Sequence, residues 1–457
     1  MSAKFATTNP ATGETVKEFP TADDATIAAL IEDSDAAFQK WRTTPLEDRI
    51  APLSKAADLM DDRRDELAAL LTLEMGKLPV EARAEVELCA SILRYYAEEA
   101  PRLLADETLS PNSGGQAVLK HEPIGPLLGV MPWNFPYYQV TRLAAPNLAA
   151  GNTIILKHAS NTPQSALAFE QIMSDALLPK DCYRNVFADN DQIQTMIADE
   201  RISGASLTGS EAAGSAVAGG AGTNLKKSIL ELGGSDPFIV LDAQDLEATV
   251  SAAVAGRMAN SGQSCIASKR FIILDDIYDD FVASLTEKMS QFVAGDPNDP
   301  ATTMAPLSSE QAAVDLIEQV EDAISHGAHV HTGGKRVDRA GAFVQPTVLT
   351  GVTPQMRSYS EELFGPVAVV YSVHDEDESI ALANDSSFGL GGTVVSADVE
   401  KAQRVADRVD TGMVWINQAT WTEPDLPFGG TKRSGVGREL GAEGIQEFVN
   451  KKLIRTP

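Results

Sequence analysis

Cysteine is scarce in this chain. Among 457 residues only Cys89, Cys182 and Cys265 carry a thiol, and they lie far apart. So few scattered cysteines cannot form the disulfide framework of a small secreted domain, and no cluster of cysteine and histidine has the spacing of metal ligands. We therefore expect reduced thiols and no structural metal ion.

Long hydrophobic runs are also missing. The sequence contains no stretch of about 18 or more apolar residues, which is the length that a membrane-spanning helix needs. Residues 1–10 lack the apolar block of a signal peptide. A soluble cytoplasmic protein without a membrane partner is the expectation.

Positive charge is in deficit. The chain has 37 Lys and Arg against 65 Asp and Glu, so its formal net charge is −28. Nucleic-acid binding needs clustered basic side chains that contact phosphates, and this balance argues against such a surface. An anionic small-molecule substrate would need a local basic pocket to overcome the general field.

The length and pattern of the chain predict an α/β protein of two or three domains. Residues 23–102 have a helical pattern, because Leu67, Leu70, Leu71 and Met75 recur at helical spacing before a stop at Gly76. Residues 108–121 instead suggest a protruding hairpin around the Ser-Gly-Gly turn at 113–115, of the kind that often pairs with another subunit.

Short apolar strands alternate with helical segments after this hairpin. The predicted strands are 127–131, 153–156, 185–187, 205–207 and 228–230. This alternation indicates a parallel sheet with crossover helices, which places ligands at the carboxyl ends of the strands. It resumes with a strand at 237–241, a helix at 246–259 and a strand at 270–274, so we expect a second α/β domain beyond a boundary near 233–235.

Cys265 is the first candidate for chemistry. It follows Gly262, Gln263 and Ser264 in a small polar run between two apolar segments. A structural cysteine usually lies inside an aliphatic run, whereas glycine permits a close backbone approach at a reactive site. From these residues alone, an inert buried thiol and a nucleophile both remain open.

Several strand ends carry polar residues that could serve such a nucleophile. Asn134 follows the first strand in a Pro-Trp-Asn-Phe-Pro segment, and its amide could donate to a developing oxyanion or cap the next helix. Lys157 could reach a ribose or phosphate, or be an ordinary surface lysine. Gly209 and Ser210 open a helix that could hold a pyrophosphate, although this turn is not the usual dinucleotide fingerprint. Glu231 could activate water or be an exposed strand-end glutamate.

These segments occur together and in an order that resembles the aldehyde dehydrogenase superfamily along essentially the whole chain. The matching segments are 132–136 (PWNFP), Lys157, 208–210 (TGS), 231–234 (ELGG), 262–265 (GQSC), 362–366 (ELFGP), 427–430 (PFGG) and 437–439 (GRE). Within the superfamily, residues 233–240 and 157–159 look most similar to bacterial succinate-semialdehyde dehydrogenases.

The resemblance implies a catalytic set of Cys265, Glu231 and Asn134. By analogy, the Cys265 thiolate attacks the aldehyde carbonyl, and the Asn134 amide and the Cys265 backbone N–H hold the resulting oxyanion. Loss of hydride to a nicotinamide then leaves a thioester, which water activated by Glu231 hydrolyses.

The resemblance also implies cofactor-binding and substrate-binding residues. The cofactor set is Met131, Pro132, Trp133, Lys157, Ser160, Gly209, Ser210, Leu232, Glu362 and Phe364. A glutamate at position 160, as in many NAD-preferring relatives, would repel a 2′-phosphate. Ser160 removes that repulsion, so NADP is the expected cofactor and NAD stays possible.

The substrate set implied by the resemblance is Phe135, Tyr138, Gln139, Arg142, Ser264 and Phe428. Arg142 shares a helical face with Phe135 and Gln139, and an arginine lining the mouth could bind a carboxylate bidentately. This favours succinate semialdehyde. Against it, Met258 and Ala259 stand where some relatives place a second arginine, the loop at 420–423 is acidic, and Arg142 could instead pair with a neighbouring carboxylate.

The predicted organisation has three parts. We expect a Rossmann-type cofactor domain over 1–104 and 124–233, a catalytic domain over 234–430, and an oligomerisation segment over 105–123 and 440–457 of a homodimer or homotetramer. Two rival hypotheses are a cysteine acyl transferase or hydrolase, which would need no nucleotide, and a catalytically silent relative. Oxidation of another small aliphatic or aromatic aldehyde is an alternative within the family.

Overall fold

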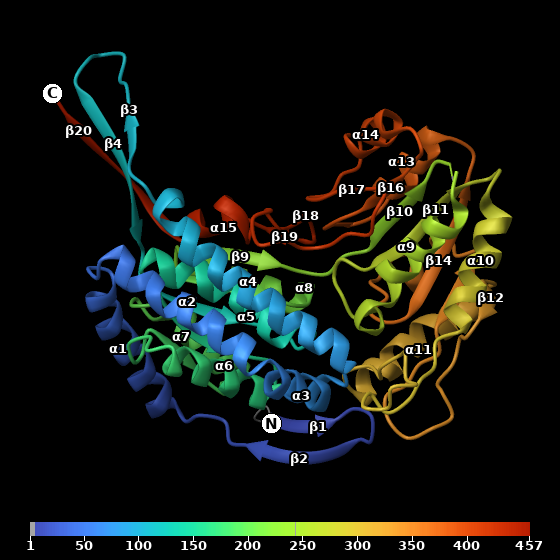
Figure 1. Cartoon of the computed structure of the whole chain (residues 1–457), viewed down its shortest axis with the longest axis horizontal. Helices are drawn as coiled ribbons and strands as arrows, with labels where there is room; N and C mark the ends of the chain where they lie inside the picture. The colour runs from blue at the N-terminus through green and yellow to red at the C-terminus, as the bar shows by residue number, and fades with distance from the viewer. Residues whose placement is uncertain (1–4, 243) are drawn as a thin grey trace.

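The computed structural model describes residues 5–242 and 244–457. Residues 1–4, which belong to the segment predicted to lack a signal peptide, lie outside the described part. Figure 1 shows two lobes side by side and an arm that projects from the first lobe. Within the described residues, no helix is both long enough and apolar enough to cross a membrane.

The N-terminal segments of the first lobe are helical, as their pattern predicted. After the hairpin of β1 (Phe5–Asn9) and β2 (Glu14–Phe19), the chain forms α1 (Asp24–Trp41), α2 (Leu46–Asp62), α3 (Arg64–Met75) and α4 (Pro79–Leu103). The face of α3 that carries Leu67, Leu71 and Met75 is buried. Gly76 ends α3 at a φ of +76°, a left-handed conformation that glycine adopts without a steric penalty.

A six-stranded sheet forms the centre of the first lobe. Its order is β19-β9-β8-β5-β6-β7. The strands are β5 (Pro126–Val130), β6 (Thr153–Lys157), β7 (Tyr183–Asn185), β8 (Gly204–Thr208), β9 (Lys227–Glu231) and β19 (Gly435–Val436). The strand predicted at 185–187 lies two residues earlier than expected. Strands β5 to β9 run parallel, so their carboxyl ends meet at one edge.

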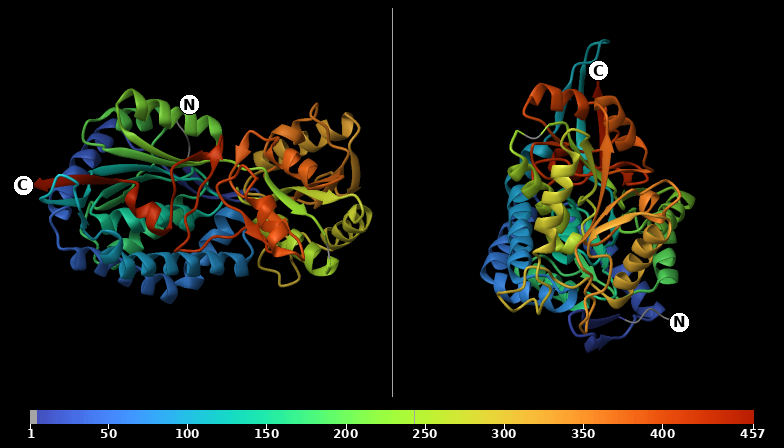
Figure 2. Two further views of the ribbon diagram at one scale, coloured as in Figure 1. Left: turned by 90° about the horizontal axis from the view of Figure 1, so that it is seen from above. Right: turned by 90° about the vertical axis from the view of Figure 1, so that its right-hand side faces the viewer.

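Helices cover both faces of this sheet, as a doubly wound fold requires. Buried side chains of α2 to α4 pack in one cluster with those of α5 (Pro136–Ala150) and α6 (Pro163–Asp175). Side chains of α1, α7 (Asn190–Ala198) and α8 (Glu211–Thr223) pack in a second cluster. Figure 2 shows the sheet between these layers.

The second lobe contains a seven-stranded sheet of order β12-β13-β14-β11-β10-β16-β17. The strands are β10 (Asp236–Val240), β11 (Ser268–Leu274), β12 (His329–Thr332), β13 (Thr347–Thr350), β14 (Val367–Val373), β16 (Thr393–Val395) and β17 (Trp415–Ile416). The helices are α9 (Leu246–Met258), α10 (Tyr278–Ser290), α11 (Glu310–Ser325), α12 (Arg357–Ser360), α13 (Glu376–Asn384) and α14 (Val399–Ala406). A short strand pair, β15 (Phe388–Gly389) with β18 (Thr431–Lys432), lies outside this sheet.

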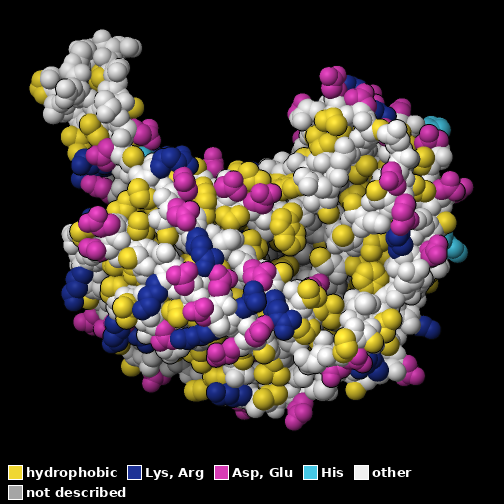
Figure 3. Space-filling view, viewed as in Figure 1, with side chains coloured by type: hydrophobic (Ala, Val, Ile, Leu, Met, Phe, Trp, Pro, Cys, Tyr) yellow, Lys and Arg dark blue, Asp and Glu magenta, His cyan; other side chains and the backbone are white. Residues whose placement is uncertain are grey.

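The arm is a three-stranded antiparallel sheet of β3 (Glu107–Leu109), β4 (Gln116–Pro123) and β20 (Val449–Thr456), so the predicted hairpin is present. Along the arm, Leu453 pairs with Leu119 and stays exposed. Just before β20, α15 (Gly441–Gln446) and Phe448 are packed in the core of the first lobe. Only the later part of the predicted 440–457 segment therefore lies in the arm. On the face shown in Figure 3, basic and acidic side chains are interspersed.

Candidate active site

Cys265 lies between two cavities. The half-buried Cys265 lines one cavity of about 390 Å³ and another of about 190 Å³. Because both cavities include Cys265 in their walls, a group bound in either one can approach the sulfur. This is the arrangement that a nucleophile between two ligands requires.

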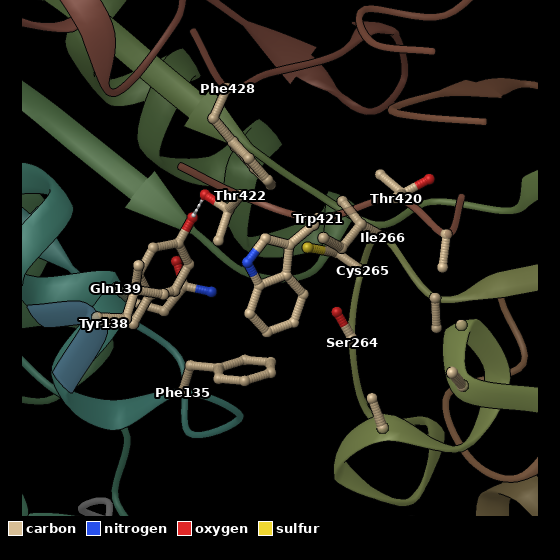
Figure 4. A pocket seen from close by; sticks show the side chains of 16 residues that line it. Phe135, Tyr138, Gln139, Ser264, Cys265, Ile266, Thr420, Trp421, Thr422 and Phe428 are labelled. Carbon is tan, nitrogen blue, oxygen red and sulfur yellow. Dashed lines mark hydrogen bonds between the residues drawn. The ribbon is translucent and has the colours of Figure 1, made fainter. Parts of the chain in front are cut away.

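The larger cavity is mainly apolar. Figure 4 shows the Cys265 sulfur pointing into it, with Trp421 in front and Phe135 and Tyr138 on the opposite side. The residues that line it are Leu88, Phe135, Tyr138, Gln139, Ala255, Gly256, Ala259, Ser264, Cys265, Ile266, Ala267, Ala419, Thr420, Trp421, Thr422 and Phe428. Five of the six predicted substrate residues are among them, and Arg142 is not.

The smaller cavity is formed at the carboxyl ends of β5, β8 and β9, where the parallel topology places ligands. The residues that line it are Pro132, Trp133, Asn134, Thr208, Gly209, Ser210, Leu232, Gly233, Cys265, Glu362 and Phe364. Trp133 and Phe364 meet edge to face with ring centroids 5.5 Å apart. Seven of the ten predicted cofactor residues are therefore together here.

The other three predicted cofactor residues lie elsewhere. Met131 is buried beneath the strand end. Lys157 is half-buried at the end of β6, where burial lowers the pKa of its ammonium group. The Ser160 side chain is exposed, and its backbone carbonyl accepts a hydrogen bond from the Ala6 N–H at 2.9 Å. Met131 follows β5, and Lys157 and Ser160 lie at or after the end of the neighbouring strand β6, at the same edge of the sheet.

A strained turn precedes the cysteine. Asn260, Ser261 and Gly262 all have φ between +52° and +76°. For the two residues that are not glycine, this conformation costs roughly 1–2 kcal/mol each. Tertiary hydrogen bonds hold the turn, since Ser261 Oγ donates to the Ala305 carbonyl at 2.9 Å and Arg257 Nη2 donates to the Gly262 carbonyl at 2.5 Å. The surroundings therefore determine the position of the thiol.

Asn134 is placed to serve as an oxyanion donor. Its side chain is buried beside the cysteine loop, where Nδ2 donates to the Gln263 carbonyl at 3.2 Å. Gln139 Nε2 lies 3.5 Å from Asn134 Oδ1, which keeps the donor nitrogen on the side of the loop. Among the described residues, no backbone carbonyl accepts a hydrogen bond from the Cys265 backbone N–H, so this N–H can also donate to an oxyanion.

Burial raises the pKa of the Cys265 thiol to about 12, and the cations of Arg142 and Lys269 oppose this rise. Lys269 Nζ donates to the carbonyls of Ser264 at 3.0 Å and Cys265 at 2.8 Å. It also pairs with Glu362 at 3.1 Å. Because a thiol with a raised pKa is a weak nucleophile, Cys265 needs a base at the moment of attack.

Glu231 ends β9 as a buried carboxylate. Neither of its oxygens has a hydrogen-bond partner among the described residues. Burial raises the pKa of Glu231 well above its usual value, the Arg142 cation opposes this, and Glu439 adds to it. A buried carboxylate of raised basicity whose charge acts on the Cys265 thiol suits a general base, and the alternative of an exposed strand-end glutamate does not match its burial.

Arg142 lies behind the wall of the larger cavity. It is fully buried, forms an ion pair with Glu439 and lies over the Phe428 ring at 4.4 Å. Its Nη1 donates to the Tyr138 hydroxyl at 3.2 Å, and that hydroxyl is 2.8 Å from Thr422 Oγ1. The ion pair that the sequence left open is therefore present, and a direct bond from Arg142 to a substrate carboxylate stays a prediction.

Some residues of the site were not among the predicted site residues. Lys269 follows Cys265 by four residues, yet only the folded loop shows that it binds the loop carbonyls. Thr208, Gly233 and Trp421 also line the cavities. They belong to the segments 208–210, 231–234 and 420–423 that the sequence analysis considered, but none was assigned a role. No group of three or more His, Cys, Asp or Glu in the described residues could hold a metal ion.

Comparisons with known proteins agree with this geometry. The model of the aldehyde dehydrogenase family matches residues 1–454. A succinate-semialdehyde dehydrogenase [NADP(+)] of Deinococcus radiodurans is 59% identical over 451 residues, which are 99% of this chain and 94% of that protein. A succinate-semialdehyde dehydrogenase [NADP(+)] 1 of Mycobacterium tuberculosis is 46% identical, with 98% and 99% of the two chains covered.

A solved structure shows the same similarity in three dimensions. The crystal structure of succinic semialdehyde dehydrogenase from Streptococcus pyogenes in complex with NADP+ superimposes with a TM-score of 0.97 at 44% identity, covering 99% of this chain and 100% of that one. The match of sequence, fold and site shows that this chain belongs to the aldehyde dehydrogenase family.

Proposed function

We propose that this chain oxidises succinate semialdehyde to succinate with NADP as the hydride acceptor. The observation that carries the proposal is the position of Cys265 between an apolar cavity suited to an aldehyde and a second cavity at the strand ends. The relatives named for this activity and cofactor support it, because they match nearly the whole chain.

The residues of the second site fit a dinucleotide phosphate. Ser210 caps the N-terminus of α8, whose amide dipoles favour an anion. Lys157 would meet the phosphate on the ribose, and Ser160 leaves room for it, because no carboxylate stands there to repel it. When bound, NADP supplies the acceptor for the hydride, and the protein supplies its position beside the sulfur.

The protein groups divide the chemistry between them. Glu231 takes the thiol proton, so that the sulfur can bond to the aldehyde carbon. Asn134 Nδ2 and the Cys265 N–H donate to the oxygen that becomes negative. Glu231 then gives up the thiol proton to solvent and is again a carboxylate. It takes a proton from water as the water attacks the thioester carbon, and the carboxylic acid leaves as the C–S bond breaks and the Cys265 thiolate is restored. Asn134 and Cys265 share the wall of the smaller cavity, and Glu231 is a buried carboxylate whose charge acts on the Cys265 thiol.

The substrate carboxylate would meet hydroxyl groups rather than the guanidinium itself. Arg142 donates to the Tyr138 oxygen, which shares a hydrogen bond with Thr422. We assign Tyr138 as the donor in that bond, so that the Thr422 proton can point into the cavity. The buried cation thus strengthens the hydroxyl donors in front of it. In this form, the role predicted for Arg142 is compatible with its ion pair to Glu439.

A neutral aldehyde is the second candidate substrate. The observation that favours it is the lining of the larger cavity, in which the described residues include four aromatic rings and no Lys or Arg. An apolar wall binds an aliphatic or aromatic aldehyde by burial of carbon surface and offers a carboxylate few donors. The acyl-transferase hypothesis is weaker, because it gives the second cavity no purpose.

The experiment that tests the proposal is a panel of aldehydes with either cofactor. We expect succinate semialdehyde with NADP to give the highest kcat/KM. In Thr422→Val, the activity with succinate semialdehyde should fall about tenfold more than the activity with butanal, because the hydroxyl that donates to the carboxylate is lost. If butanal is preferred in the parent, the carboxylate proposal is wrong and the neutral aldehyde takes its place.

The arm supports a proposal about assembly. Its exposed strand β20 offers unpaired backbone groups and apolar side chains, including Leu453 at 59% and Ile454 at 40% exposure. Exposed strands of this kind pair with another chain. We infer a homodimer or homotetramer in the cytoplasm, and light scattering of the full chain beside one lacking residues 449–457 tests the assembly.

A further inference from the structure

Three charged side chains, the buried Lys77 and Glu85 and the half-buried Glu81, stand at the start of α4. Lys77 and Glu85 are 1% and 3% exposed and form an ion pair. The Lys77 ammonium also lies 3.7 Å from the centre of the Phe135 ring. One oxygen of Glu81 is buried without a partner among the described residues. Buried charges are costly to keep, so their contacts require an explanation.

Glu85 holds the segment that contains Asn134. Its Oε1 accepts hydrogen bonds from the backbone N–H groups of Tyr137 at 2.8 Å and Tyr138 at 3.2 Å. These are free N–H groups in the first turn of α5, which begins two residues after Asn134. The carboxylate therefore fixes the start of α5 and, with it, the position of the Asn134 side chain.

Glu81 holds the loop that contains Cys265. Its Oε1 accepts the Asn260 N–H at 2.7 Å. Asn260 is the first left-handed residue of the strained turn, and its Nδ2 donates to the carbonyls of Asn134 at 3.0 Å and Gln263 at 3.2 Å. One residue held by Glu81 thus joins the Asn134 segment to the cysteine loop.

We propose that Glu81 and Glu85 are positioning residues that keep the two halves of the oxyanion hole in register across the two lobes. Glu85 acts on the half that supplies the Asn134 amide, and Glu81 acts on the half that supplies the Cys265 N–H. The two glutamates are one turn apart on α4, so they share a face and their spacing is set by the helix. This inference rests on the roles proposed for Asn134 and Cys265.

Two substitutions at Glu81 distinguish two explanations of its role. In the first, its acceptor oxygen positions Asn260. In the second, its negative charge only stabilises the N-terminus of α4. Glu81→Gln keeps the length and the acceptor oxygen and loses the charge. Glu81→Asp keeps the charge, which also favours the helix N-terminus, and loses one methylene of reach. Positioning predicts that Glu81→Gln stays within about threefold of the parent kcat, whereas Glu81→Asp falls about tenfold or more.

The measurements are kcat, the KM for aldehyde, the Kd for NADP and the melting temperature of each full-length variant. In Glu81→Asp we expect kcat to fall with KM and Kd nearly unchanged. Glu87→Ala is the matched control, since Glu87 lies on α4 but is exposed and pairs with Arg64 at the surface. Its kcat should equal that of the parent.

Two results would overturn the inference. One is a Glu81→Asp enzyme with parental kcat, and the other is a Glu81→Gln enzyme slower than Glu81→Asp. A variant that only melts earlier, with parental kcat at low temperature, counts against positioning. Cys265→Ala, assayed in parallel, separates the two proposals. If Cys265→Ala still oxidises the aldehyde, the proposed function fails. If Cys265→Ala is inactive while Glu81→Asp keeps the parental kcat, only the inference about positioning fails.

Discussion

The two cavities that meet at Cys265 are built in different ways. The smaller one consists largely of loops that directly follow β5, β8 and β9, so neighbouring strands of one sheet supply its walls. The larger one takes residues from α4, α5, α9, the cysteine loop and residues 419–428, which come from both lobes. The first cavity depends mainly on sheet topology and takes Cys265, Glu362 and Phe364 from the second lobe, whereas the second cavity depends throughout on how the lobes pack.

This difference indicates where the protein can change its specificity. A strand-end site stays in place as long as the parallel sheet forms, because the sheet fixes every loop start. The walls of the larger cavity are side chains on separate elements, so a substitution there alters the shape without disturbing the sheet. We therefore expect cofactor binding and aldehyde selection to respond independently to mutation.

A substitution of Cys265, which lines both cavities, should have the largest effect on activity. Cys265→Ala removes the nucleophile, so kcat should fall by at least about 10³-fold. NADP belongs to the other cavity, and its Kd should stay within about threefold of the parent value. Steady-state kinetics and a binding titration check both statements. If nucleotide affinity is lost as well, the two cavities are not independent.

Asn134 lines the smaller cavity beside Cys265, and its loss should be the next largest effect. Asn134→Ala removes one oxyanion donor, which typically costs about 10²–10³-fold in kcat. Asn134→Asp keeps the shape and replaces the donor with an acceptor, so it should be at least as slow. The KM for aldehyde should change little. A loss below about fivefold in both variants would assign the oxyanion to other donors.

The thiol itself can be titrated without any ligand. The raised pKa of Cys265, about 12, means that the reactive thiolate is a small fraction at neutral pH and grows as the pH rises. Alkylation by iodoacetamide should therefore accelerate about tenfold per pH unit, or roughly 100-fold between pH 7 and pH 9. Cys265→Ala, in which the buried Cys89 and Cys182 remain, gives the background. A flat profile would mean that the thiol is already ionised.

Cofactor preference gives the smallest predicted effect and touches only the strand-end site. Ser160→Glu places a carboxylate where the 2′-phosphate of NADP would lie, so the ratio of kcat/KM for NADP to that for NAD should fall about tenfold or more. Ser160→Ala is the matched control and should leave the ratio nearly unchanged. An unaltered ratio in Ser160→Glu would contradict the role given to this position.

Much of the strand-end site was predictable because its residues are local. Trp133, Gly209 and Leu232 each lie within three residues of a strand end. The alternation of strands and helices indicates where those ends are, and the family resemblance assigned Trp133 and Leu232 to the cofactor site. The hairpin of the arm was predictable for the same reason, from its Ser-Gly-Gly turn. The boundary of β7 was not, because a three-residue strand carries little periodic signal.

The sequence by itself determined the α/β alternation, the candidate thiol and the polar residues at the strand ends, because these depend on residue type and short-range spacing. Only the tertiary structure decided that Arg142 pairs with Glu439 behind the cavity, that Lys269 binds the cysteine loop, and that Glu81 reaches Asn260 from the other lobe. Glu81 and Asn260 are 179 positions apart, whereas Lys269 is four positions from Cys265 and reaches its carbonyl only through the folded shape of the loop. No local pattern encodes these contacts, since they depend on how the folded chain brings the side chains together.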